Sequence, residues 1–335
     1  MPGRRRFVRA AVAAAVAIGL GHRAAFAQPV ERTVRIGILR PTAEPRSADQ
    51  YTAEVLLPAA LAKLGYVRGR NLVIEARYGG GDAQRIAALA RELAQLRVDV
   101  IVAVGSAAIV AAKQATATIP IVMWGNFDPV AAGFVASLAR PGGNVTGVLI
   151  APEGTLGAKK LELLKEAVPG ARRIAVLAPE DPGSIAVQLP ELRQAAGVLK
   201  LDLPVVAVRN GDYADAFARI AATRADALFV VATTYFFSDR RPIIDLANRH
   251  RLPAIWEWRE QVLDGGLMAY GTSLAARYQR IAEVIDQILK GANPGDMPVD
   301  RPVRFELTVN LKAAKVIGLA LPQALLLRAD EVIQS

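Results

Sequence analysis

Short apolar segments alternate with amphipathic segments over most of this 335-residue chain, and the alternation starts again near its middle. The short segments are rich in Val and Ile, as strands are, and the intervening ones have the 3.6-residue apolar spacing of helices. The first series predicts strands at residues 34–39, 71–78, 98–104, 119–124 and 145–150, and helices at 48–64, 86–96, 106–115 and 129–138. The second predicts strands at 173–177, 204–208, 227–231 and 254–256, and helices at 156–167, 188–199, 213–223, 241–249 and 275–289. Such alternation is typical of α/β folds with parallel, doubly wound sheets.

The two series also resemble each other in sequence. The segment VDVIVA at residues 98–103 corresponds to ADALFV at 225–230, and a Gly-Gly pair follows later in each series. We therefore expect an α/β protein with two Rossmann-like lobes, each built on a doubly wound parallel sheet, and a cleft between the lobes. The first lobe is assigned residues 30–149 plus 273–300 and the second lobe residues 150–272. Residues 301–335 are expected to form a C-terminal segment that crosses between the lobes.

The first 27 residues have the pattern of an export signal. Four Arg within residues 4–9 precede a short Ala-rich apolar run, and Ala25-Phe26-Ala27 supplies a small-x-small cleavage site. The apolar run is shorter than the ~20 residues that a membrane-spanning helix needs. The Arg cluster fits either a twin-arginine signal or an Arg-rich general secretory signal. Because the chain contains no Cys, lipid anchoring is excluded, and we expect a soluble periplasmic protein that begins near Gln28.

The charge and the His and Cys content exclude several classes of function. The leader contains five Arg and no acidic residue, so much of the formal net charge of +10 leaves with it. The remaining basic residues are scattered, which argues against a nucleic-acid partner. Without Cys, and with His250 as the only His outside the leader, no metal site, cofactor or catalytic triad is expected. His250 is interpreted as a structural residue at a basic helix end.

A series of motifs resembles one known family along essentially the whole mature chain. The motifs are AxxxxGYVxGxN at residues 60–71, VDVIV at 98–102, ATxTIPIV at 115–122, SLARPGGNVTG at 137–147, KLELLKE at 160–166, GGLMxYG at 265–271 and LLLRADEVI at 325–333. The chain thereby resembles the ABC-transporter substrate-binding family that includes the TrpX-type tryptophan- and tyrosine-binding proteins. The resemblance implies the type I periplasmic-binding-protein fold and a binding component of an importer, which delivers its ligand to a membrane permease. It does not identify the ligand.

Candidate ligand contacts follow the predicted strands, because open α/β sheets bind ligands beyond the carboxyl ends of their strands. Ser106 and Ala107 open a helix after a buried strand, where free N–H groups suit a carboxylate. The alternative is that Ser106 only caps this helix. In the resembled family a Pro usually stands where this chain has Ala107. Thr42, after the first strand, completes the first group.

Asn126, Phe127 and Asp128 end another strand of the first lobe. Asn126 offers a donor or an acceptor, Phe127 a stacking surface, and Asp128 an acceptor for an amine. The alternative for Asp128 is the N-cap of a helix that begins at Pro129. Asn126 and Phe127 depart from the Gly-Asp-Pro-Val pattern of the resembled family, which indicates a different ligand.

The second lobe contributes polar and aromatic residues at its strand ends, namely Thr234, Tyr235, Trp256, Trp258 and Tyr270. The rings suit an aromatic or apolar ligand, with Glu257 or Arg259 available to its charged ends. The alternative is packing between the lobes. The predicted ligand is a small carboxylate-bearing molecule with an aromatic or apolar body, such as an amino acid. The protein is expected to be a monomer.

A Rossmann-like enzyme acting on a small organic acid is the competing hypothesis. Its support is the Gly79-Gly80-Gly81 loop, which lies between a strand and a helix as a phosphate-binding loop would. This loop lacks the third Gly of a dinucleotide fingerprint and the Lys-Ser/Thr of a P-loop. Asp82 is expected to be the N-cap of the following helix. We therefore predict a binding protein without catalytic residues.

Overall fold

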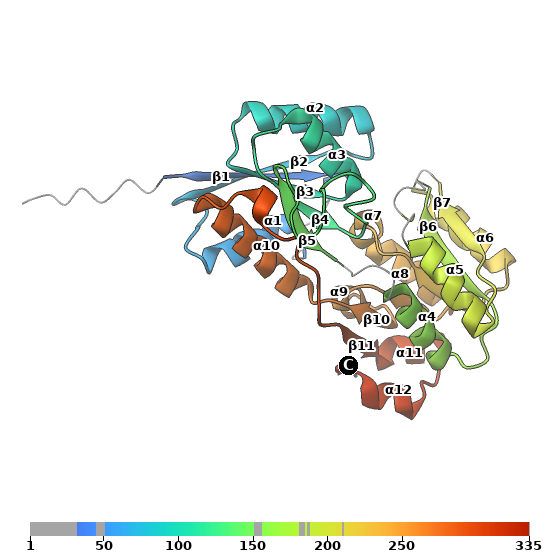
Figure 1. The fold of residues 1–335 in the computed structure, drawn as a ribbon. Helices are drawn as coiled ribbons and strands as arrows, with labels where there is room; N and C mark the ends of the chain where they lie inside the picture. The colour runs from blue at the N-terminus through green and yellow to red at the C-terminus, as the bar shows by residue number, and fades with distance from the viewer. Residues whose placement is uncertain are drawn as a thin grey trace, which may run out of the picture. The chain divides into compact units, whose positions relative to one another are not determined.

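The computed structural model describes residues 32–44, 51–150, 156–180, 185, 188–209 and 211–334. The predicted export signal and the first residues of the helix expected at 48–64 lie outside these ranges. Two sheets organise the described residues (Figure 1).

The first sheet has five parallel strands in the order β2-β1-β3-β4-β5. Their bounds are β1 Val34–Arg40, β2 Leu72–Tyr78, β3 Val100–Val104, β4 Ile121–Gly125 and β5 Val145–Leu149. The helices that cover this sheet are α1 Ala53–Ala62, α2 Ala83–Gln95, α3 Ser106–Ala115 and α10 Leu274–Leu289. Alternate residues of β3 face opposite sides: Val102 packs in a core with residues of α1 and α10, and Ile101 packs with residues of α2 and α3. Because both faces are covered, the strand is apolar throughout.

The second sheet has seven strands in the order β12-β11-β10-β9-β8-β6-β7, and only β10 and β11 pair antiparallel. Its strands are β6 Ile174–Pro179, β7 Val205–Val208, β8 Ala227–Val230, β9 Ala254–Trp256, β10 Met268–Gly271, β11 Glu306–Asn310 and β12 Glu331–Ile333. The helices of this half are α4 Leu156–Ala167, α5 Gln188–Leu199, α6 Tyr213–Ala222, α7 Thr234–Ser238, α8 Arg240–Arg249, α9 Arg259–Leu263, α11 Leu311–Ile317 and α12 Gln323–Arg328.

The two sheets repeat one topology. The order β7-β6-β8-β9-β10 of the second sheet matches β2-β1-β3-β4-β5 of the first, strand for strand. The Asp that precedes the third strand plays the same part in each half. Asp99 Oδ2 accepts a hydrogen bond of 2.7 Å from Arg35 N at the start of β1, and Asp226 Oδ2 accepts one of 2.9 Å from Arg173 N before β6. The predicted fold class, with two doubly wound lobes, is confirmed.

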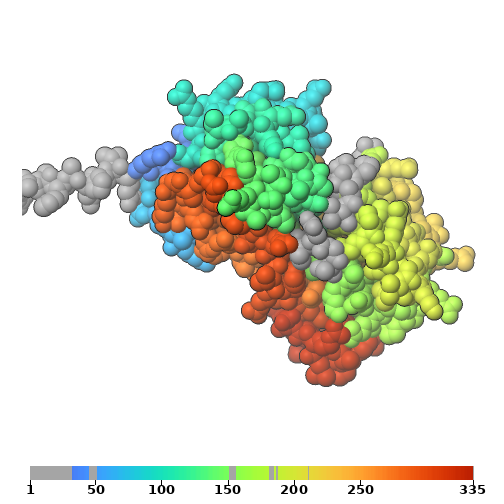
Figure 2. Space-filling view, in the orientation of Figure 1, coloured from blue at the N-terminus to red at the C-terminus, as the bar shows by residue number. Residues whose placement is uncertain are grey.

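The chain passes between the sheets after β5, after β10 and again before β11 (Figure 1). Helix α10 packs against α1, although more than 200 positions separate them in the sequence, and Figure 2 shows its orange segment against the blue and green segments of the first half. Beyond α10, Asp300 forms a β-bridge with Val148, and its carboxylate accepts hydrogen bonds from Arg277 and Arg280 at 2.7 and 2.8 Å. The chain then enters β11.

One predicted helix is absent from the structure. Residues 129–138 form a turn and irregular backbone, so the helix predicted there was wrong. Asp128 Oδ1 accepts hydrogen bonds of 2.9 Å from the backbone N of Val130 and Ala131, as an N-cap would. The turn ends at Gly133, whose φ of +68° is left-handed and stops helical propagation. The Asp128-Pro129 sequence therefore starts a single turn and not a helix.

Candidate functional site

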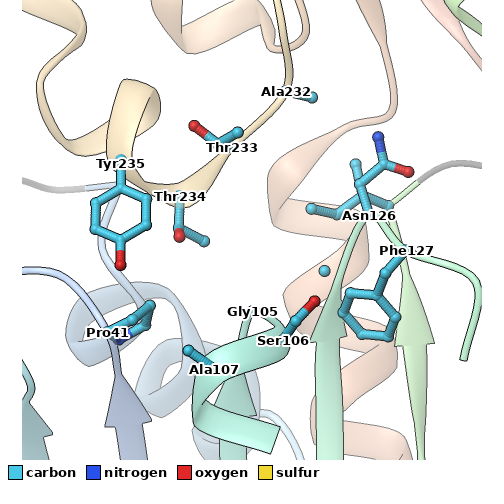
Figure 3. Close-up of a pocket in the computed structure, with 12 residues that line it drawn as sticks. Pro41, Gly105, Ser106, Ala107, Asn126, Phe127, Ala232, Thr233, Thr234 and Tyr235 are labelled. Atoms are coloured by element: carbon cyan, nitrogen blue, oxygen red, sulfur yellow. The ribbon is translucent and has the colours of Figure 1, made fainter. Parts of the chain in front are cut away.

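A pocket lies where the carboxyl ends of strands from the two sheets meet (Figure 3). Loops after β1, β3, β4 and β5 supply one side of it, and the segment after β8 supplies the other. The pocket is lined by Pro41, Gly105, Ser106, Ala107, Gly125, Asn126, Phe127 and Ile150 from the first half, and by Ala232, Thr233, Thr234 and Tyr235 from the second. This is the edge at which open α/β sheets bind ligands.

The start of α3 forms the floor of the pocket. Its N-cap is Gly105 and not Ser106, and no side chain caps it. The first intrahelical hydrogen bond runs from Ile109 N to Gly105 O, so the N–H groups of Ser106 and Ala107 precede the helical ladder. A Cβ on Gly105 would lie 3.7 Å from Thr234 Oγ1, which shows how closely the two halves approach here. Uncapped N–H groups and the helix dipole give this surface a positive potential suited to an anion.

Of the three predicted ligand contacts after β4, two line the pocket and one does not. Asn126 and Phe127 line the pocket, whereas Asp128 is committed to the turn described above. The ring of Phe127 lies against Gly125 and packs edge-on to Phe134 at 5.4 Å between centroids, so it belongs partly to the core.

The predicted contacts after β8 both line the pocket. Thr234 faces the start of α3, and the ring of Tyr235 extends toward Pro41 (Figure 3). Thr233 holds this segment in place as the N-cap of α7, because its Oγ1 accepts a hydrogen bond of 3.1 Å from Phe236 N. Thr42 lines an adjoining groove together with Arg40 and Tyr235, and its buried hydroxyl has no hydrogen-bond partner among the described residues.

The predicted aromatic residues take different positions. Trp256 is fully buried in the core of the second half, and Tyr270 packs against Phe305 with centroids 6.0 Å apart. Neither ring lines the pocket or the small cavity next to it. Trp256 is the last residue of β9 and belongs to the core cluster of the second half. Trp258 lies beyond the strand end, as the N-cap of α9, and is directed to the first half.

Trp258 belongs to a small cavity next to the pocket, here called the aromatic chamber. Its lining comprises Arg40, Tyr51, Val104, Trp124, Ile150, Thr234, Phe237, Trp258, Leu274 and Tyr278. Ile150 and Thr234 line both the pocket and the chamber, so the two adjoin. The rings of Phe237 and Trp258 pack edge-on at 5.0 Å, and those of Trp124 and Tyr278 are 5.7 Å apart. Burial raises the pKa of Tyr278 above its usual value, so its hydroxyl stays neutral.

Sequence reasoning missed Arg40, the charged residue of the chamber. Only 6% of it is exposed, at the carboxyl end of β1. Its Nη1 donates to Glu54 Oε2 at 3.2 Å, and its Nη2 donates across the two halves to Ser238 Oγ at 3.3 Å. The available signal in the sequence was an Arg at the carboxyl end of a strand whose four preceding residues are uncharged.

The Gly-rich loop does not form a phosphate cradle. Gly79 N, Gly80 N and Gly81 N donate to the carbonyl oxygens of Arg40, Thr42 and Pro41 at 2.8, 2.9 and 2.7 Å. These donors hold the loop after β1 and are not available to a nucleotide. Asp82 caps α2 as predicted, with Oδ1 accepting from Gln84 N at 2.7 Å.

His250, the one His among the described residues, occupies the end of a helix. His250 is the C-cap of α8, and its ring lies 5.6 Å from that of Phe217. Within the described ranges, no cluster of three or more His, Cys, Asp or Glu side chains could bind a metal. In that same part of the chain, no helix has the length and apolar character to cross a membrane.

Comparisons with known proteins place this chain in a family and identify similar structures. The family model of the ABC transporter substrate binding protein matches residues 50–333. A tyrosine-binding protein of Clostridioides difficile (strain R20291) is 26% identical over 279 residues, which cover 82% of this chain and 80% of that protein. Among solved structures, a conserved domain protein from Vibrio cholerae is 27% identical, with a TM-score of 0.80 over 90% of this chain and 100% of that one. An ABC domain in complex with L-Trp from Streptococcus pneumonia is 24% identical, with a TM-score of 0.78 and the same coverage.

The family match spans well over half of the chain. The chain belongs to the ABC transporter substrate-binding protein family, whose members are solute-binding proteins and not enzymes.

Proposed function

We propose that this protein is the periplasmic solute-binding component of an ABC importer. It captures a small carboxylate-bearing ligand with an aromatic body between a first lobe (residues 30–149 plus 273–300) and a second lobe (150–272). The observation that carries the proposal is the pocket, in which an uncapped helix start from one half faces Thr234 and Tyr235 from the other.

The two ends of the site suit the two ends of such a ligand. The ligand carboxylate accepts hydrogen bonds from the N–H groups of Ser106 and Ala107, and the Ser106 hydroxyl adds a donor. Its aromatic body extends past Ile150 and Thr234 into the aromatic chamber. The name of the tyrosine-binding relative and the L-Trp in the pneumococcal structure support an aromatic amino acid.

We expect the lobes to separate when a ligand enters the pocket and the chamber. The pocket has a volume of about 80 Å³ and the chamber about 20 Å³. Pockets for small molecules usually measure about 300–1,000 Å³. Ala232, Phe237 and Trp258 of the second half pack in the core cluster of the first, so they close the site. A hinge motion at the connections between the sheets opens and closes it.

The binding test uses isothermal titration calorimetry with aromatic amino acids, aliphatic amino acids, sugars and polyamines. An aromatic amino acid should bind without being consumed, and Ser106→Asp should abolish binding because it places a negative charge at the carboxylate site. Gln114→Glu, which adds a charge at the exposed far end of the same helix, should bind like the wild type. Binding of a sugar or polyamine alone would reject the ligand class.

The cellular part of the proposal has its own tests. The mature protein, collected from the periplasm, should begin at or near Gln28, and it should migrate as a monomer in size-exclusion chromatography. Deletion of the cognate permease should stop ligand uptake while ligand binding persists. An uncleaved protein confined to the cytoplasm would contradict the transport role.

A further inference from the structure

Two buried donors of the aromatic chamber have no hydrogen-bond partner among the described residues: Arg40 Nε and Trp258 Nε1. Arg40 is 6% exposed and Trp258 is 3% exposed, and both residues line the chamber. They come from different halves, since Arg40 ends β1 and Trp258 precedes α9. Buried N–H groups in native proteins are nearly always paired, so two unpaired ones at one cavity indicate a partner supplied by a ligand.

The chemistry of these groups defines what that partner must be. A guanidinium and an indole N–H both donate and never accept. The nearby Glu54 carboxylate already pairs with Arg40 Nη1 and does not line the chamber. The two unpaired groups are therefore donors next to a shell of rings, and the group complementary to them is a hydrogen-bond acceptor at the end of an aromatic body.

We propose that Arg40 and Trp258 are specificity-determining residues that select an aromatic acid with an acceptor, such as a phenolic oxygen, at the end of the ring remote from its carboxylate. The inference rests on the proposed function, because the carboxylate is taken to bind at the start of α3. It predicts a higher affinity for L-tyrosine than for L-phenylalanine, because L-phenylalanine would leave both donors unpaired. It also predicts a higher affinity for L-tyrosine than for L-tryptophan, because the indole N–H of L-tryptophan adds a third donor.

Packing between the lobes does not explain the two donors. A contact that serves only to close the lobes needs apolar surface, which Phe237, Trp124 and Tyr278 already supply. A Phe at position 258 would pack similarly without burying an unpaired N–H. Arg40 does join the halves through the hydrogen bond from its Nη2 to Ser238 Oγ, but that contact leaves its Nε unpaired within the described residues. Polar groups retained in such a place discriminate between ligands, because a site built to hydrogen-bond a hydroxyl rejects the analogue that lacks it.

The experiment measures the affinities of L-tyrosine, L-phenylalanine, L-tryptophan and 4-cyano-L-phenylalanine by calorimetry. The nitrile of the last compound accepts a hydrogen bond but cannot donate one. The wild type should prefer L-tyrosine and the cyano compound to L-phenylalanine by at least about ten-fold. Trp258→Phe and Arg40→Met should each reduce this ratio several-fold, because each removes a donor that only L-tyrosine and the cyano compound can use. Circular dichroism establishes that each variant is folded.

Trp256→Phe is the matched control. Trp256 is also a buried Trp whose Nε1 has no partner among the described residues, but it lies in the core of the second half and does not line the chamber. This substitution should leave the ratio of tyrosine to phenylalanine affinity unchanged. Equal affinity of the wild type for tyrosine and phenylalanine would overturn the inference and leave the proposed function intact. If none of the four aromatic compounds binds, both the inference and the proposed function are overturned.

Discussion

Lys160 Nζ and Glu257 Oε2 are 2.6 Å apart, in an ion pair whose side chains are only 2% and 1% exposed. Lys160 belongs to α4, and Glu257 directly follows β9, so the pair ties a helix to the strand ends of the second half. The ammonium group also lies 4.9 Å from the centre of the Phe229 ring. Burial raises the pKa of Glu257, and the charge of Lys160 opposes that rise. The stability of the folded protein should therefore fall when either member of the pair is removed alone.

Removal of Lys160 alone should be strongly destabilising. Lys160→Met leaves a buried carboxylate without its partner, which costs about 3–5 kcal/mol. The double variant Lys160→Met/Glu257→Leu should recover most of this loss, since replacement of both members by apolar groups is often close to neutral. Urea denaturation at pH 7 measures both. Lys159→Met, which breaks the exposed pair with Glu162, should change stability by less than about 1 kcal/mol.

The pH dependence of the unfolding free energy of the Lys160→Met variant should reflect the titration of the Glu257 carboxyl group. Its pKa in the folded protein is raised above the ordinary value of 4.5, so the folded state holds the proton more tightly than the unfolded state. The resulting stabilisation is complete below pH 4.5 and is lost as the pH rises through the folded pKa. Lys160→Met should therefore lose stability relative to Lys160→Met/Glu257→Gln as the pH is raised from 4.5 to 8. A constant difference between the two unfolding free energies would contradict this.

Gly271 ends β10 where the chain leaves the second sheet, and its lack of a side chain is required by a close approach. A Cβ there would lie 1.9 Å from the carbonyl oxygen of Glu257. Gly271→Ala should therefore destabilise the protein by about 1–3 kcal/mol or more, as overpacking does. Gly170→Ala is the control, because open space surrounds that position within the described residues. Thermal unfolding of the two variants tests the contrast.

Local sequence patterns predicted most of the fold. The helices α3, α4 and α5 and the strand β9 have the predicted bounds, because capping, periodicity and apolar runs are short-range signals. The repeated segments around Asp99 and Asp226 indicated the duplicated topology, in which both carboxylates cap the first strand of their sheet. The strands and helices after residue 301 escaped prediction: β12 has only three residues, and nothing local encodes the antiparallel pairing of β11.

The site was predicted less completely than the fold. The ends of apolar strands can be located in the sequence, so the loops that follow them could be predicted. Ser106, Asn126 and Thr234 were selected in this way, and all three line the pocket. The aromatic chamber instead joins residues from Arg40 to Tyr278, and only tertiary packing brings them together. Local pattern could not separate Trp256 from Trp258 either, although one ring packs in the core and the other closes the chamber. Their roles depend on where β9 ends.

Arg97 adopts a left-handed backbone conformation at the end of α2, with a φ of +50°. An L-residue with a side chain pays about 1–2 kcal/mol for this conformation, and Gly avoids most of it. Because Arg97 is exposed and follows the helix, its side chain contributes little that Gly would lose. Arg97→Gly should therefore raise the free energy of unfolding by about 0.5–1 kcal/mol, after the greater flexibility of Gly in the unfolded chain is subtracted.

Arg91 provides the opposite case within the same helix. It is also exposed, but it lies inside α2, where Gly costs about 1 kcal/mol relative to good helix formers. Arg91→Gly should lower the unfolding free energy while Arg97→Gly raises it, although both changes remove the same charge. Urea denaturation of the two variants separates backbone conformation from charge. Equal destabilisation by both substitutions would mean that Arg97 contributes through its side chain and that its backbone carries no relievable strain.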